Sequence, residues 1–261
     1  MLQSRFERMG ARLKVGTGGR REQPLALDIQ SDAAGEYFDV RLRPKKITEL
    51  EVVDLRPRVR HLLLQATGDT GRHYFLCGHD EMHWFVAGIP EAAGALTNVF
   101  AAMEALKPPE VVEAQRRQGI KGKNLQRRKN AAYVRQGEWF FLPMPRLHVK
   151  KEDVLQHEPL SRGNSSKPHW AEFLYRKGGE AVYVCPVHPQ GLRHHEYFEL
   201  LRKKPRAKTW TWQRMFRNPE AYIKGCISHP DHQTICLQVW HKVLMNTENQ
   251  SQAMQHVVFL D

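Results

Sequence analysis

The sequence predicts an α+β protein made of two folded units joined by a basic segment. Short apolar runs that alternate with polar residues dominate residues 24–88 and 133–261, as is typical of half-buried strands. Residues 91–106 change to helical spacing, with Ala95, Val99 and Met103 recurring on one face. We therefore expect an N-terminal antiparallel sheet with one or two helices, followed by a C-terminal, mostly-β sandwich or small barrel.

The N-terminal unit is expected over residues 23–112, after a segment (1–22) that predicts a basic arm or a short helix. Five apolar runs predict its strands, and glycine-rich or polar turns separate them: LALDIQ, EYFDVRL, VRHLLLQA, HYFLCG and MHWFVAG. The helix over 91–106 ends before Pro108 and Pro109, and these prolines suit the first turn of a second helix.

The C-terminal unit is expected over residues 133–261, after a basic connector at 113–132. The run YVRQGEWFFLPMP predicts one strand that ends at two prolines. The runs AEFLYRK and AVYVCPV predict a hairpin across Gly178 and Gly179, and HHEYFELLRKK predicts a short helix that stops at Pro205. The run AYIKGCISHPDHQTICLQVWHKVLM predicts another hairpin and a final strand.

The composition and the motif content argue against several classes of protein. No apolar run approaches the roughly 20 residues that cross a bilayer, so no transmembrane segment is expected, and the N-terminus lacks the pattern of a secretory signal. Four scattered cysteines in 261 residues do not make a disulfide scaffold, so we expect reduced thiols in a cytoplasmic protein. Motifs for nucleotide binding, nucleophile elbows, zinc proteases and kinases are missing from the sequence.

The strongest functional clue is a positive segment without acids. Arg116–Arg135 contains eight Lys or Arg and no Asp or Glu, in a chain of net charge +12. A polyanion neutralises such charge efficiently because its counterions are released on binding. We therefore expect nucleic acid to contact the basic side chains of this segment: Arg116, Arg117, Lys121, Lys123, Arg127, Arg128, Lys129 and Arg135.

A second positive segment interleaves cations with aromatic residues. No acid lies between Glu199 and Glu220, and the expected contacts there are Lys203, Lys204, Arg206, Lys208, Trp210 and Trp212. Cations that follow phosphates, with aromatic faces that stack on bases, are typical of proteins that bind RNA or single strands. Nucleic acid is therefore the expected partner. An acidic protein would use the same charges without the aromatic residues. The ordinary alternative is that Trp210 and Trp212 are core residues and the charges form a solvated face.

The histidines suggest a separate, metal-dependent site. In the run from His229 to His232, Pro230 and Asp231 favour a reverse turn, which brings the flanking imidazoles close together. Two imidazoles make half of a metal site, and His169 is the expected third ligand. The further ligand would be Glu172 or His241.

Such a site would suit a metal-dependent β-barrel enzyme of the hydrolase type. A divalent metal would bind the imidazoles, and Asp231 would orient one of them or act as a base. The ordinary alternative is a turn whose histidines only bond to the backbone.

Two other groupings remain open at this level. The Cys-x-x-His pairs Cys185/His188 and Cys226/His229 are together compatible with a zinc site. The polar run Cys77–His83 is compatible with a second ligand site, a catalytic loop or simply a hairpin tip. The sequence therefore predicts a class of partner and leaves open whether the protein is an enzyme.

Overall fold

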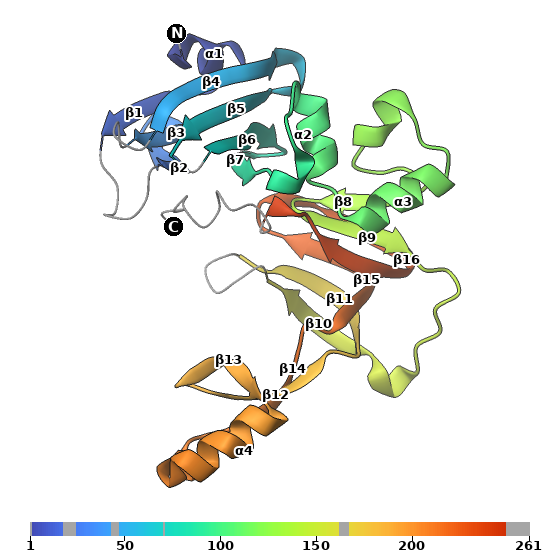
Figure 1. Cartoon of the computed structure of the whole chain (residues 1–261). Helices are drawn as coiled ribbons and strands as arrows, with labels where there is room; N and C mark the ends of the chain where they lie inside the picture. The colour runs from blue at the N-terminus through green and yellow to red at the C-terminus, as the bar shows by residue number, and fades with distance from the viewer. Residues whose placement is uncertain (1, 18–24, 43–46, 70, 162–166, 249–261) are drawn as a thin grey trace.

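The computed structural model describes residues 2–17, 25–42, 47–69, 71–161 and 167–248. It has the expected mixed α+β architecture, with sheets and helices in the N-terminal half and a sheet-rich C-terminal half (Figure 1). Within these ranges no helix is long and apolar enough to cross a membrane.

The N-terminal half contains two sheets. Strands β1 (Leu13–Thr17), β3 (Gly35–Leu42) and β2 (Leu25–Asp32) form one sheet in that order, with β1 parallel to β3. An antiparallel meander forms the other, in the order β4 (Ile47–Arg56), β5 (His61–Gly68), β6 (Gly71–Asp80) and β7 (His83–Gly88). Six strands lie between residues 25 and 88 in place of the expected five, because β4 was not among the predicted runs.

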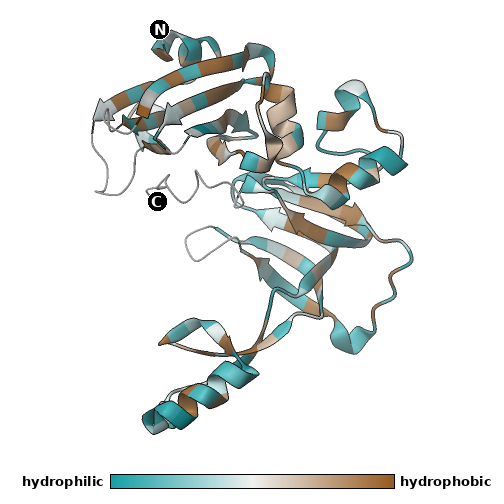
Figure 2. Cartoon of the chain, viewed as in Figure 1, coloured by the Kyte–Doolittle hydropathy of each residue, from teal (hydrophilic) through white to brown (hydrophobic). Residues whose placement is uncertain are grey.

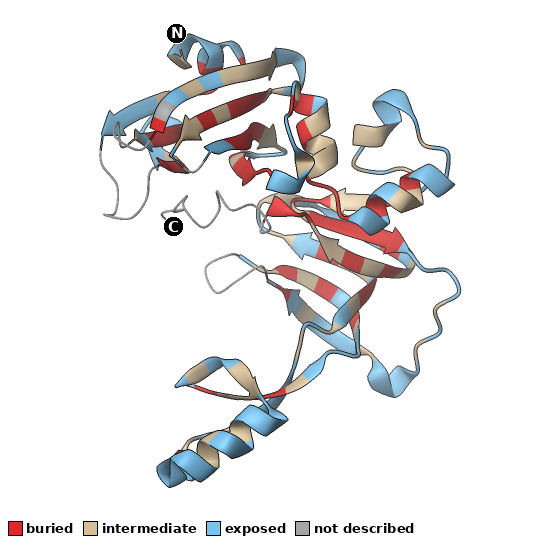
Figure 3. Cartoon of the chain, viewed as in Figure 1, coloured by how far each residue is buried: buried red, intermediate tan, exposed pale blue. Residues whose placement is uncertain are grey.

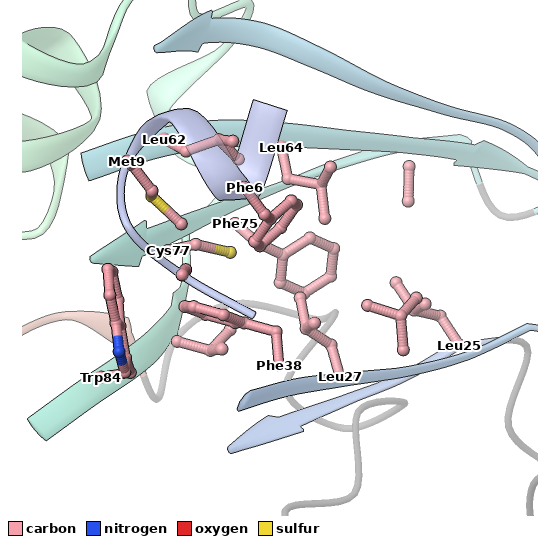
Figure 4. Close-up of a cluster of buried hydrophobic side chains, with 14 of the residues drawn as sticks. Phe6, Met9, Leu25, Leu27, Phe38, Leu62, Leu64, Phe75, Cys77 and Trp84 are labelled. Atoms are coloured by element: carbon pink, nitrogen blue, oxygen red, sulfur yellow. The ribbon is translucent and has the colours of Figure 1, made fainter. Parts of the chain in front are cut away.

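The two N-terminal sheets enclose a common apolar core (Figure 4). Helix α1 (Leu2–Arg8) contributes Phe6, which is fully buried and lies edge-on to Phe38 at 5.0 Å between ring centroids. Phe38 in turn meets Trp84 of β7 at 5.5 Å. The short-helix alternative for the N-terminal segment is therefore the one observed for residues 2–8, and residues 18–22 lie outside the described ranges.

Two further helices follow the meander. Helix α2 (Val99–Ala105) begins at Asn98, whose side chain accepts a hydrogen bond from the Ala101 N–H, and packs on the outer face of the second sheet. Helix α3 (Pro109–Arg117) begins at the expected proline. Its Val111 packs against Tyr133 and other residues of the C-terminal half, so α3 joins the two halves of the chain.

A six-stranded antiparallel sheet forms the body of the C-terminal half. Its order is β10 (Leu155–Leu160), β11 (His169–Lys177), β15 (Glu220–His229), β16 (His232–Met245), β9 (Trp139–Pro143) and β8 (Val134–Gln136). The terminal strands β10 and β8 do not pair within the described ranges, so the small-barrel alternative is wrong. The expected single strand over 133–145 is split into β8 and β9, because Gly137 adopts a left-handed backbone (φ +55°) between the paired residues Gln136 and Trp139.

Residues 178–219 form an insertion that projects from this sheet, called here the projecting unit (Figure 1). Lys177 of β11 pairs with Glu220 of β15, and between them lie β12 (Glu180–Cys185), β13 (His188–Arg193), α4 (His194–Lys203) and β14 (Gln213–Arg217). The expected hairpin across Gly178 and Gly179 is wrong: β11 pairs with β10 and β15, whereas β12 pairs with β13 and β14. The helix before Pro205 is confirmed as α4.

The cysteines correct one expectation from the sequence. Cys226 of β15 and Cys236 of β16 are direct cross-strand partners and form a disulfide, so the expectation that all thiols are reduced is wrong. Their pairing depends on the hairpin register, which cysteine counting does not reveal. Cys77 and Cys185 are free and buried, and burial raises the pKa of the Cys77 thiol.

Candidate metal centre and basic surfaces

The hairpin between β15 and β16 brings His229 and His232 together as predicted. They are direct cross-strand partners around the two-residue loop of Pro230 and Asp231. The strand register shifts between Ile227 and His229, as expected because proline does not fit the primed turns of regular hairpins. Their ring centroids lie 4.6 Å apart.

His169 completes a group of three imidazoles. It is the first residue of β11, the strand next to β15, and its ring lies 4.1 Å from that of His229 and 5.4 Å from that of His232. One potential ligand atom from each histidine lies within 4.8 Å of the others, so the group can hold a metal ion. We call these three residues the histidine centre.

The His169 ring is suited to donate a lone pair. Only 2% of the residue is exposed, and its Nε2 has no hydrogen-bond partner within the described residues. Burial, reinforced by the neighbouring imidazoles of His229 and His232, lowers the pKa of His169 to about 3. The ring therefore stays neutral at pH 7, which is the form that binds metal ions.

His229 is oriented by the backbone on both sides of its ring. Its Nε2 lies 3.2 Å from the carbonyl oxygen of Lys167, and its Nδ1 accepts a hydrogen bond from the Asp231 N–H at 3.1 Å. The tautomer that satisfies both contacts has its proton on Nε2 and its lone pair on Nδ1. A metal ion at Nδ1 would replace the weak bond to Asp231, while the Lys167 carbonyl would keep the ring in place.

His232 lies at the wall of a partly open space of about 180 Å³ between the two halves of the chain. A Cβ atom on Gly137 would come within 2.8 Å of His232 Nε2, so any larger residue there would crowd this nitrogen. Arg135, Glu138 and Asn246 also line the space. The volume is sufficient for a few water molecules or a small polar ligand.

Two other sequence-predicted ligands lie apart from this group. Glu172 instead accepts a hydrogen bond from the Cys226 N–H at 2.7 Å. His241 is buried on β16, where its Nδ1 is 2.8 Å from the carbonyl oxygen of Val239. The proposed Cys2His2 combination is not assembled either, because Cys226 is in the disulfide and Cys185 belongs to the projecting unit.

The first basic segment is partly neutralised by the protein itself. Arg116 and Arg117 end α3 and pair with Glu113 of the same helix. Arg128 forms ion pairs with Asp80 and Glu81 in the turn between β6 and β7. Arg135 is half-buried above the ring of Phe140. The other four predicted contacts are exposed: Lys121, Lys123, Arg127 and Lys129.

The second basic segment belongs to the projecting unit. Trp210 and Trp212 are half-buried and pack together, 5.9 Å apart, and Trp212 donates a hydrogen bond to the Ala207 carbonyl. The Lys204 ammonium lies 5.1 Å from the centre of the Trp210 ring, while Lys203 pairs with Glu199. Arg206 and Lys208 are exposed on the short helical turn after α4.

The two basic segments are not brought together. The first lies beside α3 and β9, whereas the second projects from the far end of the six-stranded sheet (Figure 1). A short ligand therefore cannot contact both.

Sequence reasoning missed several residues around these sites. Glu81 and His83 come from the polar run whose hairpin-tip interpretation is the one observed, and they contact the loop that carries His229 and His232. Arg214 and Phe216 were not missed, because they belong to the second positive segment of the sequence; they lie on β14, where neither side is covered. In the sequence, the only sign of a role for Glu81 is that the run Cys77–His83 holds this carboxylate near histidines. Only the tertiary structure places Glu81 at the histidine centre.

Comparison of the chain with protein-family models, curated proteins and solved structures finds no match.

Proposed function

We propose that the protein binds single-stranded nucleic acid through its projecting unit. The observation that carries this proposal is the exposure of large apolar side chains among cations. The unit contains eight Lys or Arg and three Glu, yet Phe198, Met215 and Phe216 are each about half exposed. Exposed aromatic rings beside cations suit stacked bases and their phosphates.

The unit has little core of its own that would explain these residues. Helix α4 has no buried residue, and Figure 3 shows this unit mostly exposed or intermediate. Hydrophobic and hydrophilic residues are interleaved along it (Figure 2). Because exposed apolar groups cost free energy in water, a surface of this kind is typical of a docking site.

A groove at the base of the unit offers a path for the strand. It has a volume of about 740 Å³ and is lined by Arg176, Arg214, Met215, Phe216 and the glycines that lead out of β11. The Arg214 guanidinium lies 6.0 Å from the centre of the Phe216 ring. We assign base stacking to Phe216 and phosphate contacts to the two arginines.

The first basic segment is the weaker candidate for this role. Its single aromatic residue, Tyr133, is 2% exposed and cannot stack on a base. Two of its cations are already engaged within the protein, Arg128 in ion pairs with Asp80 and Glu81 and Arg135 above the ring of Phe140.

Fluorescence anisotropy with a labelled single-stranded oligonucleotide, repeated over a range of salt concentrations, tests the proposal. The triple change of Arg206, Lys208 and Arg214 to Ala should reduce the slope of log affinity against log salt by about 2, because each lost phosphate contact contributes about 0.7. Phe216→Ala should cost about 1–3 kcal/mol through lost stacking.

The control is a double change of Arg127 and Lys129 to Ala, which removes exposed charge from the first segment. It should leave binding of a short oligonucleotide near the wild-type value. Binding that is indifferent to salt, or lost only in the control, contradicts the proposal. Loss in the triple variant without an effect of Phe216→Ala would instead indicate recognition of charge alone, as for an acidic protein.

A second candidate function is a divalent-metal centre at His169, His229 and His232. It is favoured by the buried Nε2 of His169, which has no hydrogen-bond partner within the described residues and belongs to a ring that stacks beside two other imidazoles from a neighbouring hairpin. Leaving such a nitrogen unpaired costs about 1–3 kcal/mol, and a metal ligand bond would remove that cost. Three imidazole donors fit Zn²⁺ best among common divalent ions.

A three-histidine zinc site leaves one ligand position open. Zinc in such sites lowers the pKa of a bound water to about 7, which is the chemistry of hydrolases. In this protein the space beside His232 would admit water and a small substrate.

Elemental analysis tests the metal centre directly. Protein purified without chelator, loaded with excess Zn²⁺ and then desalted should retain about one zinc ion per chain. Retention of no stoichiometric zinc, iron, manganese or nickel would remove this candidate and leave the nucleic-acid proposal unaffected.

A further inference from the structure

The turn between β6 and β7 contacts the hairpin that carries two of the three histidines. A carboxylate oxygen of Glu81 accepts a hydrogen bond from the Gln233 N–H at 2.7 Å. The same oxygen, Oε2, lies 3.5 Å from Nδ1 of His232. The N-terminal half therefore supplies a carboxylate to the edge of the histidine centre.

The Nδ1 atom of His232 is buried and makes no hydrogen bond within the described part of the chain. Its distance to Glu81 Oε2 is slightly longer than a good hydrogen bond, so a small movement of the two side chains toward each other would form that bond. On the other side of the ring, Nε2 lies beside Gly137, which has no side chain. The two nitrogens thus have different surroundings, one beside a carboxylate and one beside a glycine.

Glu81 is itself held in place. Arg128 pairs with both Asp80 and Glu81, and the Glu81 backbone is left-handed (φ +48°) at the tip of the hairpin. A neighbouring contact joins the same two hairpins, since His83 lies between Glu36 and Asp231 at 2.6 and 3.6 Å. The carboxylate therefore keeps a fixed direction toward His232.

We infer that Glu81 is a positioning residue for the histidine centre, holding the proton of His232 on Nδ1 and leaving Nε2 free to bind the metal. This inference rests on the second proposed function, the metal centre. Ligating histidines commonly donate their other N–H to a carboxylate, which orients the ring and raises its basicity. Arg128, expected from the sequence to contact nucleic acid, would here serve to orient this carboxylate.

Asp80 provides a matched comparison. It shares the hairpin tip and the Arg128 partner with Glu81, but no contact joins it to His232 among the described residues. Asp80→Asn and Glu81→Gln each remove one carboxylate charge from the same arginine. Any difference in metal affinity between them reports the contacts of Glu81 with His232 and the neighbouring Gln233 N–H.

The experiment compares Zn²⁺ affinity by competition with a chelating dye in wild type, Asp80→Asn and Glu81→Gln. Glu81→Gln should weaken binding about 10–100-fold, as loss of an outer carboxylate does in other sites, with Asp80→Asn changing it several-fold at most. Equal losses in both variants would overturn the inference and assign both carboxylates a purely structural role.

A second measurement needs no variant and no metal. Long-range ¹H–¹⁵N NMR of histidine-labelled wild-type protein reports which nitrogen of His232 carries the proton. We expect the Nδ1–H form, and observation of the Nε2–H form overturns the inference even if Glu81→Gln does not fold. If wild type binds no zinc, the metal centre fails, whereas the NMR result still decides the role of Glu81.

Discussion

Replacing residues 178–219 by an Asn-Gly turn is expected to abolish nucleic-acid binding while leaving zinc binding intact. The projecting unit leaves the six-stranded sheet at Lys177 and returns at Glu220, which are direct partners on adjacent antiparallel strands. A two-residue Asn-Gly loop is the preferred connection for such a pair. The replacement therefore keeps both strands in register.

The size of this effect follows from what is removed. The single stacking contact assigned to Phe216, at about 1–3 kcal/mol, already predicts a fall in affinity of at least about 5-fold. Loss of the cations of the unit should make the remaining binding less dependent on salt. Anisotropy with the same oligonucleotide measures both changes.

The control for folding is the histidine centre itself. His169 is at the opposite end of β11 from the insertion, so zinc retention would show that the body is intact. Undiminished nucleic-acid binding in this variant would contradict the proposal and redirect attention to Lys121, Lys123, Arg127 and Lys129.

Changing His169 to alanine is expected to eliminate stoichiometric zinc. The residue supplies the only one of the three imidazoles that does not come from the β15–β16 hairpin, so the remaining pair retains only part of the donor set. A direct ligand should matter more than an outer carboxylate, and we expect a loss of more than about 100-fold in affinity. Elemental analysis after zinc loading and desalting measures it.

His241→Ala is the matched control. His241 is also a buried strand histidine, 7% exposed against 2% for His169, but it lies outside the histidine centre. Both variants should lose thermal stability through a cavity, whereas only His169→Ala should lose zinc.

The effect of added zinc on the melting temperature separates loss of zinc binding from loss of stability through a cavity. Free zinc at 100 times its Kd stabilises a protein that binds one ion by about 2.7 kcal/mol. The melting temperature of wild type and His241→Ala should therefore rise with zinc, and that of His169→Ala should not. A rise in all three would mean that zinc binds elsewhere.

Local elements were predictable where their signals are local. The proline at the start of α3, the proline after α4 and the Pro230–Asp231 turn act through neighbouring residues, and each was found where expected. Gly137 is a local feature that led to a wrong prediction, because its left-handed backbone divides one predicted strand into two.

Strand partners were less predictable, because pairing joins residues that are distant in the sequence. The chain between AEFLYRK and AVYVCPV contains two glycines. Glycines suit a hairpin turn, and they suit a segment that leaves the sheet equally well. The choice depends on β15, about 40 residues later, which occupies the position beside β11. The disulfide depends on the same kind of information, since the register of β15 and β16 sets Cys226 opposite Cys236.

By itself the sequence determined the α+β class, the positive charge and the two-histidine turn, because composition and short-range spacing carry these properties. Only the tertiary structure decided which of the charges are paired within the protein and which lie beside exposed aromatic rings. It pairs Arg128 with Asp80 and Glu81 and leaves the cations of the projecting unit beside exposed aromatic rings. It also places His169 beside His229, because neighbouring strands of a sheet bring distant residues within a few ångströms of each other.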